Sequence, residues 1–255
     1  MMNNENQISR QTKLFGFIGE HAGVSRFSTV LNKSFKENSD DAMMIPMNIR
    51  EDDFYFTLSN MKQSQLNGSI ISSEYTQQVV ELLDSSSGLV KRSGMCDIVF
   101  KEGDTLRGDI FSIRVLLERL KDIGATKIAM IGTNPYAKVF SLMACGFTLS
   151  YFNDDLESLM SFSQEMELRD ADMNRIAAGM SIDLSAYDAV LDFSDLSNFD
   201  MIEKLPHYCF DMKNAKQYSS IKTRASQLES TYIGYDDMID SLTQQAYRLI
   251  IKGNK

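Results

Sequence analysis

The clearest pattern of apolar and polar positions in this chain runs from residue 127 to residue 155. The short apolar run Lys127–Ile131 is bounded by a glycine and predicts a buried strand. Pro135 stands where a helix would begin, a position at which its missing N–H has no cost. Apolar residues at helical spacing follow, Gly146 ends the helix, and Phe147–Phe152 predicts a second strand. The stretch therefore has the outline of a nucleotide-binding βαβ unit.

The same kind of spacing predicts strands and helices that alternate along the rest of the chain. The expected strands are Leu14–Gly19, Ala42–Ile49, Gly68–Ile71, Cys96–Phe100, Thr105–Asp109, Ala186–Phe193 and Tyr208–Met212. The expected helices run from the capping residue Ser25 to about Glu37, over Asp52–Met61, Tyr75–Leu83 and Ser112–Ile123, from Asp155 to about Met166, and over Met238–Ile251. Residues 1–12 are expected to fray, and Ser85–Gly88 to form a loop.

This alternation predicts an α/β fold with mostly parallel sheets and two domains. Residues 1–110 are expected to form an N-terminal α/β domain of the substrate-binding type. Residues 111–237 are expected to form a Rossmann-like nucleotide-binding domain. The closing helix, residues 238–251, is expected to pack back on the first domain.

The turn after Lys127–Ile131 carries part of a dinucleotide-binding fingerprint. That fingerprint is G-x-G-x-x-G or A, and the chain offers Gly132, Asn134 and Ala137 at its three positions. The middle position differs, because a glycine there lets the backbone approach a pyrophosphate, whereas Asn134 adds a side chain. Asparagine nevertheless tolerates unusual backbone angles better than most residues. The motif therefore leaves two interpretations open: a nucleotide-binding turn, or a βαβ unit that binds no nucleotide.

The composition argues against several classes of function. The chain has 255 residues, a net charge of −9 and no long basic run, which disfavours binding to nucleic acid or to an anionic membrane. It has neither a long apolar stretch nor a signal peptide, so a soluble, cytoplasmic protein is expected. Three scattered cysteines fit reduced thiols better than a disulfide framework. With two histidines and no C-x-x-C pair, no metal site is expected.

Four segments carry motifs that recur together in a known family. They are the opening GFIG at Gly16–Gly19 with Ser25, Asn32 and Phe35, then Gly68–Asp84, the turn Gly94–Ile98, and Leu106–Leu120. From Leu14 to about Ile251 the chain resembles the shikimate dehydrogenase family, in which these segments read S-x-S-P…H-N-x-x-F, G-x-N-V-T-x-P-x-K, G-A-x-N-T and L-x-G-x-N-T-D. The resemblance implies a substrate domain, a Rossmann NADP domain and a last helix that returns to the first domain.

The residues to which the resemblance would assign catalysis are replaced. The family's catalytic lysine falls on Thr76, and its partner aspartate falls on Ser112. In the family this pair takes up the proton of the substrate hydroxyl while hydride leaves to the nicotinamide. Neither hydroxyl is basic enough near neutral pH to replace the lysine, and the loss of a positioned acid–base group typically lowers a rate about 10²–10⁴-fold. We therefore expect no catalytic residue at the family's positions.

The substrate positions implied by the resemblance keep only part of their character. Ser25 retains a serine, Ser72 stands for a threonine, and Asp97 replaces an asparagine. Three further ligand positions become apolar, namely Phe27, Ile70 and Leu242. Each substrate hydroxyl left unpaired would cost about 1–3 kcal/mol. Shikimate is therefore not expected to be the substrate.

The segment after the second strand of the βαβ unit bears on the cofactor. In the resembling enzymes an Asn-Arg-Thr segment holds the 2′-phosphate of NADP, whereas this chain has Asn153, Asp154 and Asp155. Two carboxylates repel a phosphate, while one of them, Asp154, could accept a hydrogen bond from a free ribose hydroxyl. NAD is therefore expected over NADP if a dinucleotide binds. The alternative is that both acids cap the next helix and that no cofactor binds.

The sequence supports three functional hypotheses. The first is a divergent shikimate dehydrogenase-like pseudoenzyme that binds a different small molecule, or a partner protein, in the cleft between its domains. The second is an NAD(P)-dependent oxidoreductase acting on shikimate or another small hydroxy or keto acid. His21 or Asp97 would then be its acid–base group, unless His21 is a polar loop residue and Asp97 caps the hairpin. The third is a structural role in a complex, with the methionines of residues 160–180 either at a partner surface or in the core.

Overall fold

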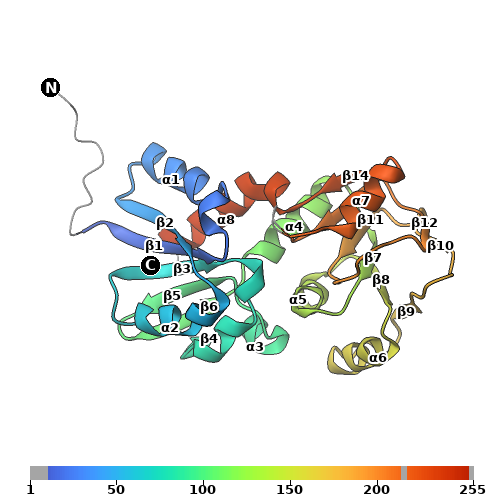
Figure 1. Ribbon diagram of the computed structural model, residues 1–255, viewed down its shortest axis with the longest axis horizontal. Helices are drawn as coiled ribbons and strands as arrows, with labels where there is room; N and C mark the ends of the chain where they lie inside the picture. The colour runs from blue at the N-terminus through green and yellow to red at the C-terminus, as the bar shows by residue number, and fades with distance from the viewer. Residues whose placement is uncertain (1–10, 214–216, 253–255) are drawn as a thin grey trace. The chain divides into compact units, whose positions relative to one another are not determined.

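The structure, a computed structural model, describes residues 11–213 and 217–252 and divides them into two compact units (Figure 1). The first unit contains the chain up to Ser87, the segment Cys96–Asp109 and the chain from Ile239 onward. The second contains Gly88–Met95 and Ile110–Met238. The segment Gly88–Met95, which the sequence leaves in the first domain, thus groups with the second unit. The expected fraying at the start of the chain concerns mainly residues 1–10, which lie outside the described residues.

A six-stranded mixed sheet forms the centre of the first unit, in the order β2-β1-β3-β5-β6-β4. β1 pairs in parallel with both β2 and β3, so the carboxyl ends of these strands meet at one edge of the sheet. β5 and β6 form the predicted antiparallel hairpin, which turns at Gly103 with a φ of 63°. The strands are β1 (Lys13–Gly19), β2 (Ala42–Asn48), β3 (Leu66–Ile71), β4 (Ser85–Ser86), β5 (Ile98–Glu102) and β6 (Thr105–Asp109).

The helices of the first unit include one from each end of the chain. α8, the last helix, packs beside α1, and the hydroxyl of Tyr247 on α8 donates a hydrogen bond to Asp40, just after α1. α1 buries Phe27, Leu31 and Phe35, which lie at helical spacing. The helices are α1 (Phe27–Glu37), α2 (Glu51–Met61) and α8 (Ile239–Lys252), with the 3₁₀ turns η1 (Ala22–Val24), η2 (Ser73–Tyr75) and η3 (Gln78–Leu82).

The prediction of an α-helix over Tyr75–Leu83 is wrong, because the segment forms the turns η2 and η3 instead. In an α-helix the carbonyl of Thr76 would accept the amide of Val80. Here that carbonyl accepts the amide of Cys96 at 2.8 Å, and Val80 bonds to the carbonyl of Gln77 at 3.1 Å. A contact with the segment just before β5 therefore changes the local hydrogen bonding from α to 3₁₀.

The second unit is built on a six-stranded, wholly parallel sheet in the order β14-β13-β11-β7-β8-β9. Numbered along the chain, its strands lie in the order 6-5-4-1-2-3, which is the doubly wound arrangement of dinucleotide-binding sheets. The strand order reverses between β7 and β11, where such sheets bind ligands at their carboxyl edge. The strands are β7 (Lys127–Ile131), β8 (Thr148–Asn153), β9 (Asp172–Arg175), β11 (Ala189–Asp192), β13 (Tyr208–Asp211) and β14 (Thr231–Ile233).

The helices of this unit are close to their predicted bounds where the apolar period is strong. α5 starts at the predicted residue, Pro135, and α4 at Ser112. The helices are α3 (Gly88–Ser93), α4 (Ser112–Asp122), α5 (Pro135–Met143), α6 (Leu156–Glu165) and α7 (Ser220–Gln227), with the 3₁₀ turn η4 (Tyr235–Met238). Short or polar elements are absent from the sequence-based prediction: α3, α7, β4, β9, β14 and the small sheet of β10 (Ile182–Asp183) and β12 (Ile202–Lys204). The expected loop Ser85–Gly88 therefore contains β4 and the start of α3.

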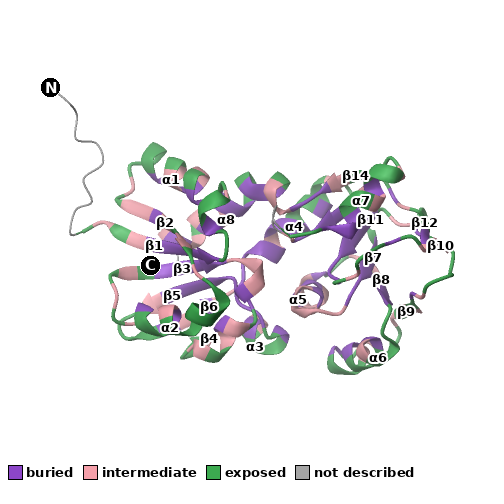
Figure 2. Ribbon diagram, viewed as in Figure 1, coloured by how far each residue is buried: buried purple, intermediate pink, exposed green. Residues whose placement is uncertain are grey.

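Buried residues concentrate in the central strands of each unit (Figure 2). In the second unit the strands β7 and β11 are buried almost completely, as parallel strands covered on both faces should be. Their core includes Ala129, Ile131 and Val190, against which Ile221 and Ala225 of α7 pack. The α/β fold with mainly parallel pairing is thus confirmed.

Candidate functional site

A carboxylate occupies the carboxyl edge of β1 and β3 in the first unit. Glu74, in the turn η2, accepts the amide of Glu20 at 2.8 Å through one oxygen and the hydroxyl of Ser72 at 2.5 Å through the other. Gly19 makes room for this arrangement, since a Cβ there would lie 2.7 Å from the Cβ of Ser72 and 3.0 Å from Glu74. Two hydrogen-bond donors at this edge are therefore already engaged by the chain's own carboxylate.

The two positions at which the resemblance expects catalytic groups hold buried hydroxyls. Thr76 is only 2% exposed, and its hydroxyl donates to the carbonyl of Ser73 at 3.1 Å. Ser112 is also buried, as the first residue of α4, and it belongs to the second unit. Neither residue supplies a basic group.

The proposed substrate residues of the first unit lie on three segments. Ser72 and Asp97 lie near each other at the end of β3, because the amide of the last β3 residue, Ile71, bonds to the carbonyl of Asp97 at 2.9 Å. Asp97 is buried. Ser25 lies before α1, where its hydroxyl accepts the amide of Phe27 at 3.2 Å, so it assists the start of the helix from one position before the cap residue, Arg26.

Acidic groups surround this edge of the first unit's sheet. The hydroxyl of Tyr75 donates to the carbonyl of Ile49 at 2.7 Å. Burial, together with the negative charges of Glu20, Glu74 and Glu51, raises the pKa of Tyr75 to about 12. The same potential disfavours a ligand that brings another carboxylate to this edge.

Three apolar positions and His21 are the remaining residues to which the sequence analysis assigned a role. Phe27, Ile70 and Leu242 are buried in the core, so their side chains hold the fold together. His21 is exposed at the start of η1, and its side chain makes no capping hydrogen bond there.

The turn between β7 and α5 in the second unit depends on its glycine. Gly132 has a φ of +97°, which L-residues rarely adopt. A Cβ on Gly132 would lie 2.4 Å from the carbonyl oxygen of Phe193 and 2.7 Å from the amide nitrogen of Ser194. The turn therefore packs directly against the backbone that follows β11, at the switch in strand order.

Asn134 and Ala137, the other fingerprint residues, bond to each other. Asn134 is the N-cap of α5, and its side-chain oxygen accepts the amide of Ala137 at 3.2 Å. Pro135, the first helical residue, has no N–H at all. In a phosphate-binding turn, the first amides of the helix point at the ligand. Here two of the first three helical positions offer no donor to a ligand while the cap is in place.

The two acids that follow β8, Asp154 and Asp155, have different surroundings. Asp155 is the N-cap of α6 and accepts the amide of Glu157 at 3.0 Å and the hydroxyl of Ser158. These bonds, the one from Ser158 first, hold the pKa of Asp155 below its ordinary value. Asp154 is exposed and precedes the cap. Asn153 is buried and donates to the hydroxyl of Thr133 at 3.3 Å, which joins this edge to the Gly132 turn.

A buried ion pair at the same carboxyl edge is absent from the sequence-based prediction. Asp192, the last residue of β11, is almost wholly buried, and Lys213 lies 3.3 Å from its carboxylate with 18% of its side chain exposed. Ser194 donates both its amide, at 2.9 Å, and its hydroxyl, at 2.6 Å, to the other oxygen of Asp192. Burial raises the pKa of Asp192, although Lys213 opposes this shift.

A second buried acid stands beside the first. Asp211, the last residue of β13, pairs in register with Asp192. It accepts hydrogen bonds from the hydroxyls of Ser219 and Tyr232, and from the amide of Lys213. Burial raises the pKa of Asp211 as well. The signal in the sequence is that AVLD and YCFD both end a buried strand in aspartate, and parallel strands bring such ends together.

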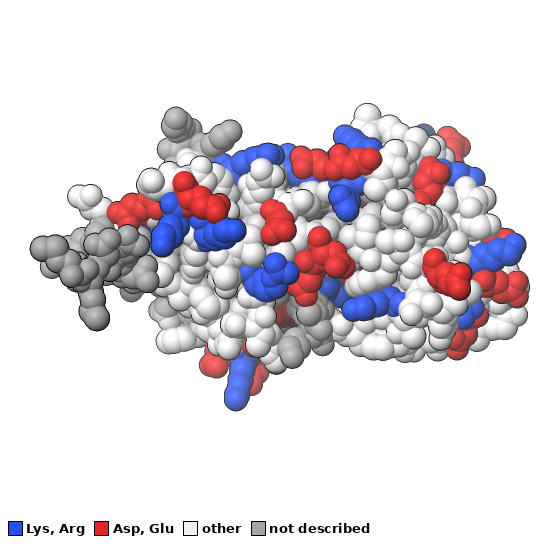
Figure 3. Space-filling model, turned by 90° about the horizontal axis from the view of Figure 1, so that it is seen from above, with Lys and Arg blue, Asp and Glu red and all other residues white. Residues whose placement is uncertain are grey.

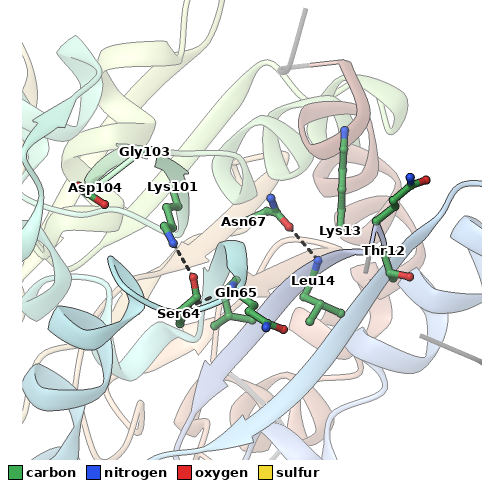
Figure 4. Close-up of a pocket in the computed structure, with 11 residues that line it drawn as sticks. Thr12, Lys13, Leu14, Ser64, Gln65, Asn67, Lys101, Gly103 and Asp104 are labelled. Atoms are coloured by element: carbon green, nitrogen blue, oxygen red, sulfur yellow. Dashed lines mark hydrogen bonds between the residues drawn. The ribbon is translucent and has the colours of Figure 1, made fainter. Parts of the chain in front are cut away.

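A pocket of the first unit lies at the start of β1, the end of the strand opposite to Ser72 (Figure 4). Its volume is about 790 Å³, and it is lined by residues at the starts of β1 and β3 and around the β5–β6 turn. Lys13 and Lys101 are its basic residues, and Lys101 donates to the carbonyl of Ser64 at 2.5 Å. Asn67 accepts the amide of Leu14 at 2.9 Å across the same opening. The sequence alone does not indicate this pocket.

Three further features concern the surface charge, the metal-ligating side chains and the hydropathy of the helices. On the face shown in Figure 3, basic and acidic side chains are interspersed. Within residues 11–213 and 217–252, no three His, Cys, Asp or Glu side chains are grouped so as to hold a metal ion. None of the described helices combines the length and the hydropathy that a membrane span requires.

Known proteins with related sequences match about half of this chain. No family model matches it. A shikimate dehydrogenase (NADP⁺) from Dictyoglomus thermophilum is 26% identical over 152 residues, which is 58% of this chain and 55% of that protein. One from Clostridium perfringens strain SM101 is 28% identical over 130 residues, 49% of this chain and 48% of that protein. The chain thus spans about half the length of the curated relatives it matches.

Solved structures extend the similarity in fold to nearly the whole chain. A Thermus thermophilus shikimate dehydrogenase in complex with NADP(H) and shikimate superposes with a TM-score of 0.72 at 13% identity, over 93% of this chain and 92% of that one. The chain is therefore similar to shikimate dehydrogenases, in sequence over about half of its length and in fold over nearly all of it. A Listeria monocytogenes shikimate dehydrogenase in complex with shikimate and NAD gives a TM-score of 0.71 at 14% identity, over 97% of this chain and 94% of that one. A 5-ketofructose reductase from Gluconobacter gives 0.73 at 14%, over 95% and 94%.

Proposed function

We propose that this shikimate dehydrogenase-like protein does not oxidise shikimate and that its first unit binds a ligand without a carboxylate, or a partner protein. The position and the hydrogen bonds of the Glu74 carboxylate are the observation that supports this proposal. Its carboxylate takes the amide of Glu20 and the hydroxyl of Ser72, at the edge where the resemblance puts the substrate. Two unit charges about 4 Å apart repel each other by roughly 1 kcal/mol in water and about 4 kcal/mol near a protein surface. An anionic acid would meet that repulsion here.

The replaced catalytic residues support the same proposal. The hydroxyl of Thr76 donates a hydrogen bond to the carbonyl of Ser73, so it cannot take up a substrate proton as a lysine would. Phe27 and Ile70 are buried apolar side chains where the resemblance expects polar ligands. A triol would leave its hydroxyls unpaired against them, at about 1–3 kcal/mol each.

The test combines catalysis with binding. Purified protein is mixed with shikimate and NADP⁺ or NAD⁺, and formation of reduced nicotinamide is followed beside an active shikimate dehydrogenase. We expect no turnover above the no-enzyme rate and no shift of the melting temperature with shikimate. In Glu74→Gln the charge is removed while the side chain keeps its shape, so shikimate should bind more tightly than to the unaltered protein. Ordinary turnover, or an unchanged affinity in Glu74→Gln, contradicts the proposal.

A second candidate is an NAD(P)-dependent oxidoreductase acting on another small hydroxy or keto acid. It is supported by the doubly wound strand order and by the close approach of Gly132 to Phe193. The exposed Asp154 favours NAD over NADP for such an enzyme. Thermal unfolding with each of the four nicotinamide dinucleotides separates the candidates, because a ligand at 100 times its Kd adds about 2.7 kcal/mol of stability. A higher melting temperature with any of the four would favour the oxidoreductase over the first candidate.

A further inference from the structure

The polar pocket at the starts of β1 and β3 has the size of a ligand site (Figure 4). Its volume of about 790 Å³ falls within the roughly 300–1,000 Å³ that small-molecule sites occupy. Most of its lining side chains carry polar groups, among them the amides of Gln65 and Asn67 and the hydroxyl of Thr12. An apolar ligand would leave such groups without hydrogen bonds, so the lining favours a polar ligand that bears hydroxyl groups.

Two lysines from different strands line this pocket. Lys13 is the first residue of β1 and Lys101 lies on β5, and β3 lies between these two strands in the sheet. Neighbouring strands are about 4.8 Å apart, so the backbones of the two lysines are separated by roughly 10 Å. Positive charge is therefore available on both sides of β3.

Neither lysine is neutralised by an acid of the described part of the chain. Within residues 11–213 and 217–252, no carboxylate lies within 4.0 Å of the side-chain nitrogen of Lys13 or Lys101. By contrast, the nearby Lys62 pairs with Asp84 at 2.7 Å. One carboxylate, that of Asp104, also lines the pocket, so two lysines face a single acid there. The lining therefore has a net positive charge, which favours an anionic ligand.

The hydrogen bonds within the chain leave donors at the wall of the pocket. Lys101 donates one of its three N–H bonds to the carbonyl of Ser64 at 2.5 Å, which fixes the ammonium group and leaves two donors for a ligand (Figure 4). The side-chain oxygen of Asn67 accepts the amide of Leu14 at 2.9 Å, so the NH₂ group of Asn67 remains for a ligand. Ionised phosphates and carboxylates accept hydrogen bonds from such donors.

We propose that this pocket binds a small polyhydroxylated molecule with two anionic groups, one bound by Lys13 and the other by Lys101. The two anionic groups are phosphates or carboxylates, since an ammonium group binds either. The NH₂ group of Asn67 and the carboxylate of Asp104 bond to the hydroxyl groups between them. This site is independent of the proposed function, because Glu74 acts at the opposite ends of β1 and β3.

Isothermal titration of the full chain with two pairs of sugar derivatives tests the proposal. Fructose 1,6-bisphosphate has two phosphates and fructose 6-phosphate has one, while galactarate has two carboxylates and gluconate has one. In at least one pair, the doubly charged member should bind at least about tenfold more tightly than the singly charged one, the usual effect of one charged hydrogen bond. The pair that shows this difference identifies the anionic groups. Equal affinities within both pairs, or no binding of any of the four compounds, overturns the proposal.

Lysine substitutions test the assignment of one anionic group to each side chain. Lys13→Met and Lys101→Met each remove one ammonium group, so each variant should bind the two members of a pair with nearly equal affinity. Lys13 is exposed, so Lys13→Met should keep the melting temperature of the unaltered protein even if Lys101→Met, which loses the bond to Ser64, is less stable. Lys121→Met is the matched control, because Lys121 is exposed on α4 in the second unit and should leave both affinities unchanged. Variants at both pocket lysines that keep the full preference for the doubly charged ligand contradict the proposal.

Backbone amide signals in NMR spectra locate the ligand without reference to its affinity. The amide of Leu14 donates to the side chain of Asn67, which lines the pocket, so its signal should shift as the doubly charged ligand is added. The amide of Glu20, which donates to Glu74 at the other end of β1, should keep its position. A shift at Glu20 without one at Leu14 would place the ligand at the opposite edge of the sheet and overturn the proposal.

Discussion

Asn134 shows how one side chain can change the use of a phosphate-binding turn. Its oxygen caps α5 by accepting the amide of Ala137, a bond that stabilises a helix start by about 1 kcal/mol. A pyrophosphate would need the same amide and the space that the side chain fills. The cap and the cofactor therefore compete for one position.

The first prediction is that Asn134→Gly increases the affinity for NAD⁺ at least about tenfold. Glycine at an N-cap costs only a few tenths of a kcal/mol relative to asparagine, so the helix should remain intact. Isothermal titration and the shift of the melting temperature with NAD⁺ measure the gain. Asn134→Asp is the matched control, since it keeps the cap but adds a negative charge and should bind no better than the unaltered protein. An Asn134→Gly variant with unchanged affinity would show that the cap is not what limits binding.

Asp192 and Lys213 illustrate a buried charge pair whose members are far apart in the sequence. The carboxylate of Asp192 is buried, so it relies on Lys213 and on two bonds from Ser194. Removing one partner of a buried pair typically costs about 3–5 kcal/mol, because the other charge is left uncompensated. The cost also depends on pH, since an unpaired carboxyl can take up a proton.

The second prediction is that Lys213→Met destabilises the protein by about 3–5 kcal/mol near neutral pH and by less toward pH 4. The pKa of Asp192 is raised in the fold above about 3.9, its value in the unfolded chain. A group whose pKa is raised on folding contributes its full stabilisation of the folded state at a pH below its unfolded pKa. That contribution is lost as the pH rises through its folded pKa. Removing Lys213 raises that pKa further and enlarges the loss.

Denaturant unfolding measured from pH 4 to pH 8 gives the comparison. The double variant Lys213→Met with Asp192→Asn should recover most of the stability and lose the added pH dependence, because position 192 can no longer carry a charge. If Lys213→Met were equally destabilising at every pH, the effect would come from packing rather than from the charge of Asp192.

At the scale of elements, the β7–α5 turn is held by its contact with the segment after β11. Gly132 and Gly146 both have positive φ, of +97° and +90°. They differ in surroundings, since a Cβ on Gly132 meets the backbone of Phe193 at 2.4 Å and one on Gly146 meets nothing within 4 Å. Alanine substitutions at the two glycines therefore distinguish two causes of lost stability. One is the unfavourable backbone angle, which both share, and the other is the close contact of the added Cβ, which only Gly132 has.

The third prediction uses this natural control. Gly146→Ala should cost about 1–2 kcal/mol, the penalty for an L-residue in a left-handed conformation. Gly132→Ala should cost roughly 2 kcal/mol more, because the added methyl must push two backbone segments apart. Urea unfolding measures both. Equal effects would mean that the turn moves freely relative to the segment after β11.

At the scale of the whole molecule, the chain leaves the first unit after Asp109 and returns at Ile239. α8 buries Ile239, Leu242, Ala246 and Ile250, and Tyr247 packs on Phe35 of α1 at 5.7 Å between ring centroids. The first unit therefore lacks part of its core until the last residues of the chain are in place.

The fourth prediction is that deletion of residues 239–255 unfolds the first unit but leaves the second folded. Limited proteolysis should then cut within the first unit and leave a resistant fragment from the second. Leu242→Ala is the graded control, and should lower the stability of the first unit by about 2–5 kcal/mol without unfolding it. A truncated chain in which both units resist proteolysis equally would contradict the role given to α8.

The sequence predicts much of the fold where a strong apolar period and a local turn signal coincide. The strand Lys127–Ile131, the helix start at Pro135 and the hairpin around Gly103 are confirmed, since each depends on residues close in the chain. The helix over Tyr75–Leu83 fails because Cys96, twenty positions beyond Thr76, takes the carbonyl that a helix would need. Elements as short as β4 or β10 carry too few residues to show a period.

For the candidate site, the sequence alone determined which chemical groups are present: no lysine at Thr76, a glycine at position 132, and two acids after β8. Side-chain chemistry and local backbone preference follow from residue identity, so these conclusions need no coordinates. Only the tertiary structure decided which groups meet, such as Glu74 with the donors that directly follow β1 and β3, or Lys213 with Asp192. Such contacts join residues from separate strands and turns. The order of the strands in the sheet sets the distances between these residues, and no local sequence pattern encodes that order.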